Sequence, residues 1–574
     1  MRSKILILFL FSNFLLSQTP RNLGFENVTV ENMVLTWKTI NRDYKIEIDS
    51  LEKFSDKRSL KIEGKNNLSD DKSDFALVSQ RISKKNFVGK ELTLKTRIKS
   101  KSDFDGVAFP YIKTIDENKK LITIRNSQDK PIKGNTDWQE IVLKIPVSEN
   151  TEFLDFGVIY KGKGTAWFDN LELFVDGKLL ENPFKELTNF EKSSIKKYIY
   201  PLKTFDPSEK DNSDLKILKN LVGNSKVVAL GESTHGSSEI YKMKDRIIRY
   251  LVKNENFDIF SIEAQMQQSY LVENYTNGNS SLKDAMKNLG YWTWRTKEMA
   301  DLLNWMKDFN NDKKKISFTG FDMQSVSEPI KQLRETFKNE QNLQSKIDKL
   351  SLTIQEFLAE NKTKRRNYIV TEEQSKTIYP IISELKSKIN SSKQLTESEK
   401  TWQNQNVRII EQLLEKSSVN RDKSMAENFI WIKNQNPNSK FILWAHNGHI
   451  NKDKNRMGGF LDEILKNDYV TFGFVFFDGI YKAYNKNDVG NVTAETPYLG
   501  TYEYWLNSLN EPYFILDIKK MKEDKDLKYL LTDFDLRTTG STKTNNEFSY
   551  RNIADDFDYL IFINKSTNSD FNYE

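Results

Sequence analysis

All three histidines of this chain lie in two short motifs, each of which directly follows an apolar run. His235 is part of Gly-Glu-Ser-Thr-His-Gly, and His446 and His449 are part of Trp-Ala-His-Asn-Gly-His. Histidine is the side chain whose unperturbed pKa lies closest to neutral, so it is the usual residue for proton transfer. A core or capping role would suit one such ring. Three rings at strand ends instead indicate a site of acid–base chemistry.

Carboxylates and one arginine are expected to join the histidines. Glu232 belongs to the first motif, Glu263 ends the next apolar run, and Asp322 follows a third run. Arg421 precedes a helix that leads into the run before the second histidine motif. Parallel strands end on one edge of a sheet, where α/β proteins bind ligands, so these groups should converge. Arg421 is a candidate for binding an anionic or carbonyl oxygen, although a single arginine is more often a surface or ion-paired residue.

Three mechanisms fit this set of side chains. In the first, a histidine activates water, a carboxylate orients that histidine, and nearby cations stabilise an oxyanion. In the second, Ser233 is a nucleophile, but its motif is G-x-S-x-x-G, one residue longer than the tight G-x-S-x-G elbow. In the third, histidines and glutamates bind a divalent metal that activates water, although no H-E-x-x-H helix supports such a site. The motifs favour the first mechanism and leave the other two open.

The segments that carry these residues have the pattern of an α/β domain. Strands are predicted over residues 226–230, 257–262, 316–319, 441–444, 470–477 and 559–563. Residues 237–254 form a predicted helix with one apolar face. Between about residues 330 and 434 almost the whole chain consists of helix formers, which predicts a large helical insertion. Residues 221–574 are therefore expected to form an α/β domain with a mostly parallel sheet.

Residues 20–178 show a different periodicity. Runs such as 92–98 and 141–145 alternate apolar and polar residues, and about eight such runs are separated by turn-forming residues. This pattern predicts an antiparallel, jelly-roll-like β-sandwich, joined to the second domain by a linker at 179–220. The segment 164–173 resembles the closing strand of jelly-roll carbohydrate-binding modules, which implies a carbohydrate partner. The aromatic residues that could stack on sugars, or instead belong to the core, are Trp37, Tyr111, Trp138 and Tyr160.

The first residues have the pattern of a secretory signal peptide. A basic start at residues 1–4 is followed by a short apolar run at 5–16 and by the small residue Ser17. We therefore expect residues 1–17 to direct export to the periplasm or the cell exterior. An uncleaved membrane anchor is the alternative. No later run of about 18 apolar residues is present, so the rest of the chain is not expected to span a membrane.

Composition excludes several classes of function. The 574 residues include 87 Lys and Arg, 81 Asp and Glu and no Cys, for a net charge of +6. A length of this kind predicts two or more domains. The weak and evenly spread charge gives no sign of a nucleic-acid partner. The lack of cysteine excludes disulfides, thiolate metal sites and a cysteine nucleophile. No phosphate-binding or dinucleotide-binding glycine motif is present, and we expect no cofactor.

Together, the motifs resemble the erythromycin esterase family. The segments that carry the resemblance are, in order, residues 227–236, 261–264, 320–322, 421–428 and 444–449. The resemblance spans most of the chain after the sandwich. It implies an α/β catalytic domain that cleaves esters or lactones by direct attack of water, without an obligatory metal. Family members that confer antibiotic resistance lack the N-terminal sandwich, which makes a polymeric or cell-surface substrate plausible.

The resemblance also implies roles for individual residues. His235 would be the general base, and Glu263 would be its essential partner. The residues expected to be catalytic are His235, Glu263 and His446, and those expected to bind substrate are Glu232, His449, Arg421 and Asp322. The expected function is an exported carboxylic ester hydrolase acting on a small-molecule or glycan-linked ester. The alternative is a binding protein that holds a metal or haem in the same pocket without turnover.

Overall fold

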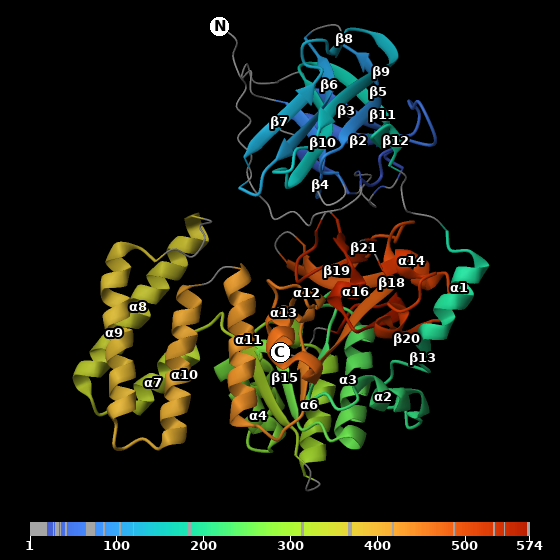
Figure 1. Ribbon diagram of the computed structural model, residues 1–574. Coiled ribbons are helices and arrows are strands. Elements are labelled where there is room, and N and C mark those ends of the chain that lie inside the picture. Colours follow the sequence, from blue (N-terminus) through green and yellow to red (C-terminus); the bar gives the residue numbers. More distant parts are fainter. Residues whose placement is uncertain are drawn as a thin grey trace.

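The computed structural model describes residues 20–570, apart from residues 27, 29–33, 35, 41–42, 65–74, 84–86, 103–104, 119, 181–185, 312–314, 365–369, 416–417, 486–487, 532–533 and 545. The expected signal peptide at residues 1–17 lies outside the described residues. Strands β1 to β12 form one body, and the remaining elements form a larger second body below it in Figure 1. None of the described helices combines the length and the apolar character needed to cross a membrane.

The N-terminal body is a sandwich of two antiparallel sheets, which confirms the predicted fold of this part. The strand order is β1-β4-β10-β6-β7 in one sheet, with β8 beside β6, and β2-β3-β11-β5-β9 in the other, with β12 beside β11. The first sheet consists of β1 (Lys38–Ile40), β4 (Ala76–Ser83), β6 (Val107–Ile115), β7 (Leu121–Asn126), β8 (Ile132–Lys133) and β10 (Phe153–Lys161). The second consists of β2 (Tyr44–Asp49), β3 (Ser59–Gly64), β5 (Glu91–Lys101), β9 (Thr136–Pro146), β11 (Gly164–Val175) and β12 (Lys178–Leu179).

Alternating burial along the strands explains this architecture. In β5, Leu92, Leu94 and Ile98 are buried in the core between the two sheets, whereas Lys95 and Arg97 lie on the opposite face and are partly exposed. Successive side chains of a strand point to opposite faces, so one apolar face per sheet suffices to build a sandwich core.

Most of the aromatic residues considered for sugar stacking are buried. Trp37 and Tyr160 belong to the core between the sheets, and Tyr111 is buried in a smaller separate cluster. Trp138 is partly exposed, and its ring centroid lies 6.0 Å from that of Phe54. Of the four candidates, Trp138 is therefore the one with a ring that a ligand can reach.

The C-terminal body is built on a mixed sheet with the order β13-β20-β23-β18-β14-β17-β15-β16, and β19 pairs with β18. All neighbours from β23 to β16 are parallel, whereas β13 and β20 are antiparallel at one edge, so the prediction of a mostly parallel sheet is confirmed. The strands are β13 (Ile199–Pro201), β14 (Val227–Leu230), β15 (Ile259–Gln265), β16 (Ser317–Asp322), β17 (Phe441–Trp444), β18 (Tyr469–Asn485), β19 (Asp488–Thr493), β20 (Tyr513–Asp517) and β23 (Tyr559–Ser566). A separate hairpin is formed by β21 (Phe534–Arg537) and β22 (Phe548–Arg551). The segment expected to be a linker thus contributes β13 to this sheet.

Helices pack on both faces of the sheet. In β14, Val227 and Ala229 belong to one apolar cluster, whereas Val228 and Leu230 belong to another, as expected for a parallel strand buried on both faces. The helices outside the insertion are α1 (Asn189–Ile195), α2 (Leu218–Val222), α3 (Ser238–Glu255), α4 (Met266–Thr276), α5 (Leu282–Asn288), α6 (Lys297–Asn310), α12 (Asn447–Ile450), α13 (Met457–Leu465), α14 (Tyr502–Asn507), α15 (Ile518–Met521) and α16 (Ile553–Asp556).

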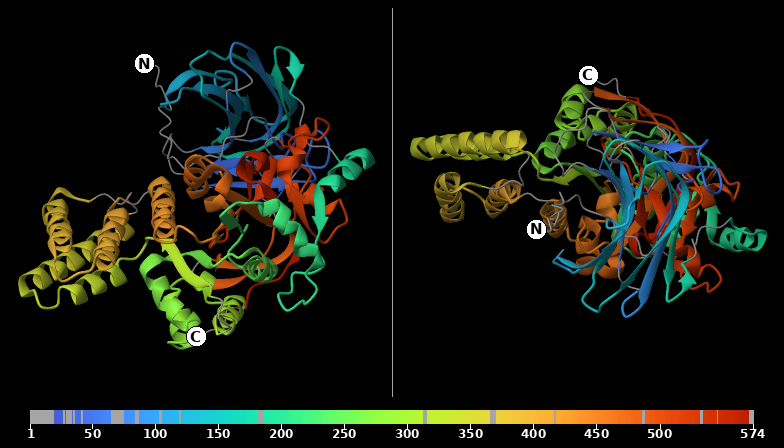
Figure 2. Two further views of the ribbon diagram at one scale, coloured as in Figure 1. Left: turned by 60° about the horizontal axis from the view of Figure 1, so that its bottom comes forward. Right: turned by 90° about the horizontal axis from the view of Figure 1, so that it is seen from above.

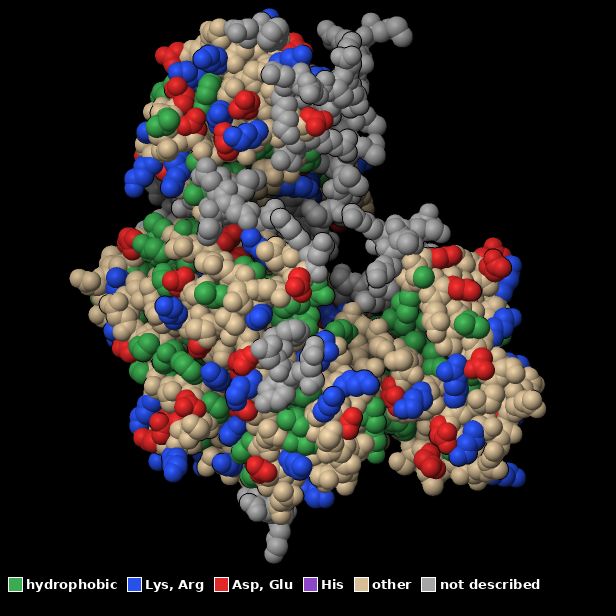
Figure 3. Space-filling model, turned by 180° about the vertical axis from the view of Figure 1, so that it is seen from behind, with side chains coloured by type: hydrophobic (Ala, Val, Ile, Leu, Met, Phe, Trp, Pro, Cys, Tyr) green, Lys and Arg blue, Asp and Glu red, His purple; other side chains and the backbone are tan. Residues whose placement is uncertain are grey.

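A helical arm connects β16 to β17. It contains α7 (Ser327–Thr336), α8 (Gln341–Lys364), α9 (Glu372–Ser391), α10 (Glu397–Leu414) and α11 (Ser418–Gln435). Figures 1 and 2 show α8 and α9 projecting away from the sheet, whereas α11 lies against it. On the face in Figure 3, basic and acidic side chains are interspersed over the arm and the body, in keeping with the small net charge.

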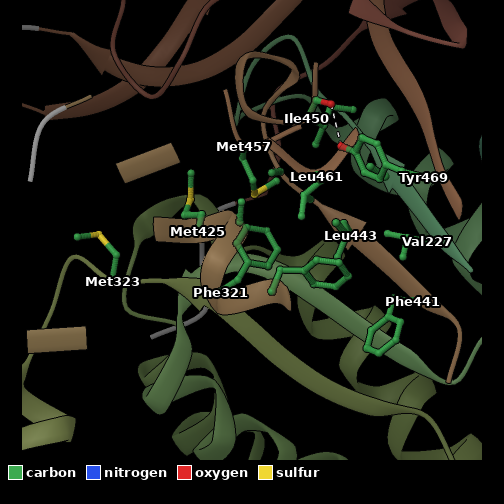
Figure 4. Packing of buried hydrophobic residues seen from close by; sticks show 14 of the residues in the cluster. Val227, Phe321, Met323, Met425, Phe441, Leu443, Ile450, Met457, Leu461 and Tyr469 are labelled. Atoms are coloured by element: carbon green, nitrogen blue, oxygen red, sulfur yellow. Dashed lines mark hydrogen bonds between the residues drawn. The ribbon is translucent and has the colours of Figure 1, made fainter. Parts of the chain in front are cut away.

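A dense apolar core fixes α11, α12 and α13 against the sheet (Figure 4). Met425 of α11, Leu443 of β17, Ile450 of α12 and Met457 of α13 are all buried in it. The Tyr469 hydroxyl in β18 donates to the Ile450 carbonyl at 2.8 Å. These segments carry the arginine and the second histidine motif of the candidate site, so their packing sets the positions of those side chains.

A buried ion pair joins the two bodies. The backbone N–H of Arg21 donates to Oε1 of Gln80 in the sandwich at 3.0 Å. The Arg21 guanidinium pairs with Asp535 of β21 and lies 4.4 Å from the ring centre of Tyr550 in β22. The Asp535 side chain is 1% exposed and also accepts a hydrogen bond from the Tyr498 hydroxyl at 2.5 Å. Arg21 therefore holds the sandwich on the hairpin of the second body.

Replacing Arg21 with methionine is expected to lower the free energy of unfolding by about 3 kcal/mol, because the buried carboxylate of Asp535 loses its cation. Urea unfolding followed by tryptophan fluorescence measures the change. The matched control is the same replacement in an Asp535→Asn background, where the loss should be much smaller. Equal losses in the two backgrounds would show that Arg21 contributes by packing and not by its charge.

Candidate active site

One cleft, with a volume of about 380 Å³, lies where β14, β15, β16 and β17 end. It is lined by His235, Glu263, Tyr291, Trp292, Thr293, Trp294, Gln324, Arg421, His446, His449, Gly540 and Ser541. The ring centroids of His235 and His446 are 5.1 Å apart, and those of His446 and His449 are 6.4 Å apart. The structure therefore brings the three histidines into one site, with Glu232 and Asp322 buried directly behind its wall.

His235 lies in the loop between β14 and α3. Its Nδ1 lies 2.6 Å from Oε1 of Glu232, and its backbone carbonyl accepts a hydrogen bond from the Tyr241 hydroxyl at 2.8 Å. Because a carboxylate accepts the proton of Nδ1, the ring takes the tautomer whose Nε2 carries a lone pair. This Nε2 has no hydrogen-bond partner among the described residues, and the ring lines the cleft. The geometry is that of an oriented proton acceptor.

Glu232 is completely buried and is surrounded by donors. Besides His235, Nζ of Lys244 lies 2.7 Å from Oε2, and the Trp444 indole N–H donates to the same oxygen at 2.6 Å. Burial raises the pKa of Glu232, but Lys244 and His235 outweigh this effect and hold the pKa below its usual value. The side chain is therefore a fixed carboxylate whose Oε1 is directed at the His235 ring.

Arg421 of α11 binds two carboxylates at once. Its Nη2 donates to Asp322 at 2.9 Å and to Glu263 at 2.8 Å, and its Nε donates to Asp322 at 3.2 Å. The other oxygen of Glu263 accepts the backbone N–H of His446 at 3.1 Å. Burial raises the pKa of Glu263, but His449 and Arg421 lower it well below its usual value. Glu232, and not Glu263, is thus the carboxylate that contacts the His235 ring.

His449 is enclosed by acidic groups. Its Nδ1 lies 2.8 Å from Asp422, and its Nε2 lies 3.3 Å from Glu263. Burial lowers the pKa of His449, but these carboxylates raise it to about 9. Nη1 of Arg421 lies 3.1 Å from the same Nε2, a contact that would otherwise favour a neutral ring. The charge balance supports a protonated His449. Three carboxylates, those of Glu263, Asp322 and Asp422, are then matched by three cations, Arg421, Arg456 and His449.

His446 differs from the other two histidines because the backbone occupies both of its ring nitrogens. Nδ1 accepts the N–H of Gly448 at 3.0 Å, so Nε2 carries the proton and donates to the Thr539 carbonyl at 3.0 Å. Burial, together with the two neighbouring histidines, lowers the pKa of His446 to about 4. A neutral ring with both nitrogens engaged favours a positioning role over proton transfer.

The geometry bears on the two other mechanisms. The Ser233 side chain is completely buried, does not line the cleft, and its hydroxyl has no hydrogen-bond partner among the described residues. No group of three or more His, Asp or Glu side chains within the described ranges is arranged to hold a metal ion. The arrangement instead suits a base, His235, facing a cationic wall formed by Arg421 and His449.

Several residues of the site did not emerge from the sequence. Lys244 lies on a helix that was predicted from its apolar face, and nothing in that pattern marked the lysine. Thr539 and Ser541 lie in a segment without a recognisable motif. Tyr291 and Trp292 belong to the run Tyr-Trp-Thr-Trp-Arg-Thr, whose three aromatic residues could have identified it as a candidate binding segment. The Tyr291 hydroxyl accepts hydrogen bonds from the side-chain amides of Gln265 and Gln324 and donates to Asp322. Burial raises the pKa of Tyr291.

This chain is similar in sequence and in fold to known proteins. The sequence profile described as Erythromycin esterase matches residues 252–566. The YbfO protein of Bacillus subtilis strain 168 is 27% identical over 382 residues, which cover 59% of this chain and 83% of that protein. Erythromycin esterase type II of Escherichia coli is 22% identical over 325 residues, which cover 49% of this chain and 75% of that protein. A crystal structure of a Bacillus cereus protein is 27% identical, with a TM-score of 0.57, and the match covers 67% of this chain and 100% of that one.

Proposed function

The chain belongs to the erythromycin esterase family, and on that basis we propose that it hydrolyses a carboxylic ester or lactone with water activated by His235. The observation that carries this proposal is the His235 ring. It is the one histidine of the three whose ring keeps a nitrogen without a partner among the described residues, and that ring faces the cleft. A general base needs a lone pair directed at the reacting atoms and a partner that fixes its tautomer.

The reaction follows from this geometry. Nε2 of His235 takes a proton from water while the water oxygen bonds to the carbonyl carbon of the ester. The negative charge that develops on the carbonyl oxygen is stabilised by the cationic wall of Arg421 and His449. The bond from carbon to the alkoxy oxygen then breaks, and the imidazolium of His235 returns its proton to that oxygen. The products are a carboxylic acid and an alcohol, or a hydroxy acid when the substrate is a lactone.

The remaining residues have supporting roles in this proposal. Glu232 orients His235 and stabilises its protonated form. Glu263 and Asp322 hold Arg421 in place, and His446 ties the loop at Thr539 to the end of β17. Mutations of these residues should act through the positions of His235 and the cationic wall.

We further propose that the substrate is an ester on a glycan or another cell-surface molecule, and that the protein is exported. The basic and apolar start of the chain supports export, and the sandwich, taken as residues 20–178 ahead of a catalytic domain at 221–574, supports a carbohydrate partner. A hydrolysis screen of purified protein over p-nitrophenyl esters, macrolides, acylated glycans and lipid esters tests the proposal. Lack of turnover, together with a bound metal or a Soret band, would favour the alternative of a metal- or haem-binding protein.

Ester hydrolysis is expected to persist after exhaustive chelation and after treatment with a serine-directed fluorophosphonate. The base has its own orienting carboxylate, both nitrogens of His446 are taken by the backbone, and Ser233 is buried. Initial rates before and after chelation, with mass spectrometry of the treated protein, measure both effects. Loss of activity that a single metal restores would support metal catalysis, and an adduct on Ser233 would support a serine nucleophile.

A further inference from the structure

A lysine is buried beneath the proposed base. Lys244 lies on α3, and its side chain is 0% exposed. Glu232 is its only hydrogen-bond acceptor among the described residues, at 2.7 Å. The rest of its surroundings are aromatic, since Nζ lies 4.2 Å from the ring centre of Trp444 and 5.6 Å from that of Phe474. The ammonium therefore has a single charged contact, and that contact is the residue that orients His235.

A buried ammonium with one acceptor is costly, because desolvation opposes it and two of its protons find only aromatic faces. Burial lowers the pKa of Lys244 to about 8, while Glu232 acts in the opposite direction, so the side chain stays charged near neutral pH. An apolar side chain of similar volume would fill the same space without this cost. The charge of Lys244 therefore requires an explanation that packing does not provide.

We infer that Lys244 is a positioning residue that acts through Glu232 and keeps His235 in its neutral, proton-accepting form. The inference rests on the function proposed above. A lone buried carboxylate beside an imidazole favours the imidazolium, which cannot act as a base. With its charge cancelled by Lys244, Glu232 supplies the orienting hydrogen bond to Nδ1 without an excess negative charge. The second donor on Oε2, the Trp444 indole, keeps Oε1 directed at the ring.

The other charged groups around His235 are balanced among themselves. Arg421 is paired with Glu263 and with Asp322, and His449 is paired with Asp422 and with Glu263. Arg456, which also pairs with Asp422, is the third cation that matches these three carboxylates. The neighbouring ring of His446 is neutral and bonded to the backbone. Lys244 is thus the cation that balances Glu232, and its removal should favour the protonated form of His235.

The variant Lys244→Met should shift the acidic limb of the kcat/KM profile to higher pH by about one unit, which lowers kcat/KM about 10-fold at pH values below the limb and much less above it. The conservative variant Lys244→Arg should restore the wild-type profile, because it returns the positive charge. A merely structural lysine would change the height of the profile but not the position of its acidic limb. An unshifted limb in Lys244→Met, at unchanged thermal stability, would overturn the inference.

A second comparison separates charge from packing. In the neutral background Glu232→Gln, adding Lys244→Met should cost less than about 3-fold in kcat/KM, since no carboxylate charge is left to balance. If the lysine acts by packing, the two losses should instead multiply. Melting temperatures of all four proteins show whether folding itself is impaired.

The three histidines allow a readout that needs no substrate. In full-length protein labelled with ¹⁵N-histidine, the ring signal lost in His235→Asn identifies His235. This signal should titrate at higher pH in Lys244→Met than in the wild type. If the wild type hydrolyses no ester but the titration moves as expected, the proposed function fails while the charge balance stands. If the titration does not move, the inference about Lys244 fails whatever the activity.

Discussion

Replacing His235 with asparagine is expected to lower kcat for ester hydrolysis by about 10²- to 10⁴-fold, the usual contribution of a general base. Asparagine is a small polar residue that can still donate to Glu232, but its amide cannot take a proton near neutral pH. Steady-state rates on a p-nitrophenyl ester measure the effect. Circular dichroism and the melting temperature should remain those of the wild type, because the His235 ring packs at the edge of a cleft.

The matched control is the same replacement at His446, whose ring centroid lies 5.1 Å from that of His235. Both nitrogens of His446 are bonded to the backbone, so its loss should act mainly by loosening the loop at Thr539. We expect His446→Asn to reduce stability more, and kcat less, than His235→Asn. If His446→Asn had the larger effect on kcat in a fully stable protein, the assignment of the base would have to move to His446.

Replacing Arg421 with methionine is expected to lower the free energy of unfolding by about 3–5 kcal/mol, the typical cost of breaking a buried ion pair, and to abolish hydrolysis. The guanidinium is the common partner of Asp322 and Glu263, both of which are buried. Without it, two carboxylates lie side by side in a region of low dielectric constant. Urea unfolding and steady-state kinetics measure the two effects.

Two further variants define the origin of that loss. Arg421→Met combined with Asp322→Asn should recover part of the stability, because one of the unpaired charges is removed. Arg421→Lys should remain folded but lose much of the activity, since an ammonium cannot reproduce the fork that spans both carboxylates. A change in stability below about 0.5 kcal/mol for Arg421→Met would mean that the site is solvated enough to tolerate the bare carboxylates.

Local patterns in the sequence were sufficient to predict the two bodies. The strands of the sandwich follow from the alternation of apolar and polar residues, as in β5, because one face of each strand must be buried. The parallel strands of the second body follow from short runs that are apolar throughout, because they are covered on both faces. The histidine motifs were recognisable for the same reason: they are contiguous, and they directly follow such strands.

The pairing of charges could not be predicted in this way. The sequence, through the family resemblance, implied Glu263 as the partner of His235, but the structure places Glu232 on its Nδ1 and gives Glu263 to Arg421 and His449. Each of these contacts depends on side-chain directions at strand ends that are far apart in the sequence. A difference of a few ångströms in reach decides which carboxylate meets which cation.

Contacts between segments that are distant in the sequence also explain the other differences between the predicted and the observed structure. Residues 199–201 lie in a segment that resembled a linker, and only the exposed edge of the sheet at β20 makes them a strand. Trp37 and Tyr160 lie in the core, and not on a sugar-binding face, because of the way the two sheets stack. The sequence by itself determined which residues could do chemistry and which segments would form strands and helices, since these depend on residue type and local periodicity. Only the tertiary structure decided that one histidine keeps a nitrogen without a partner among the described residues, because folding brings the carboxylates and the backbone groups that bind the other ring nitrogens to the site.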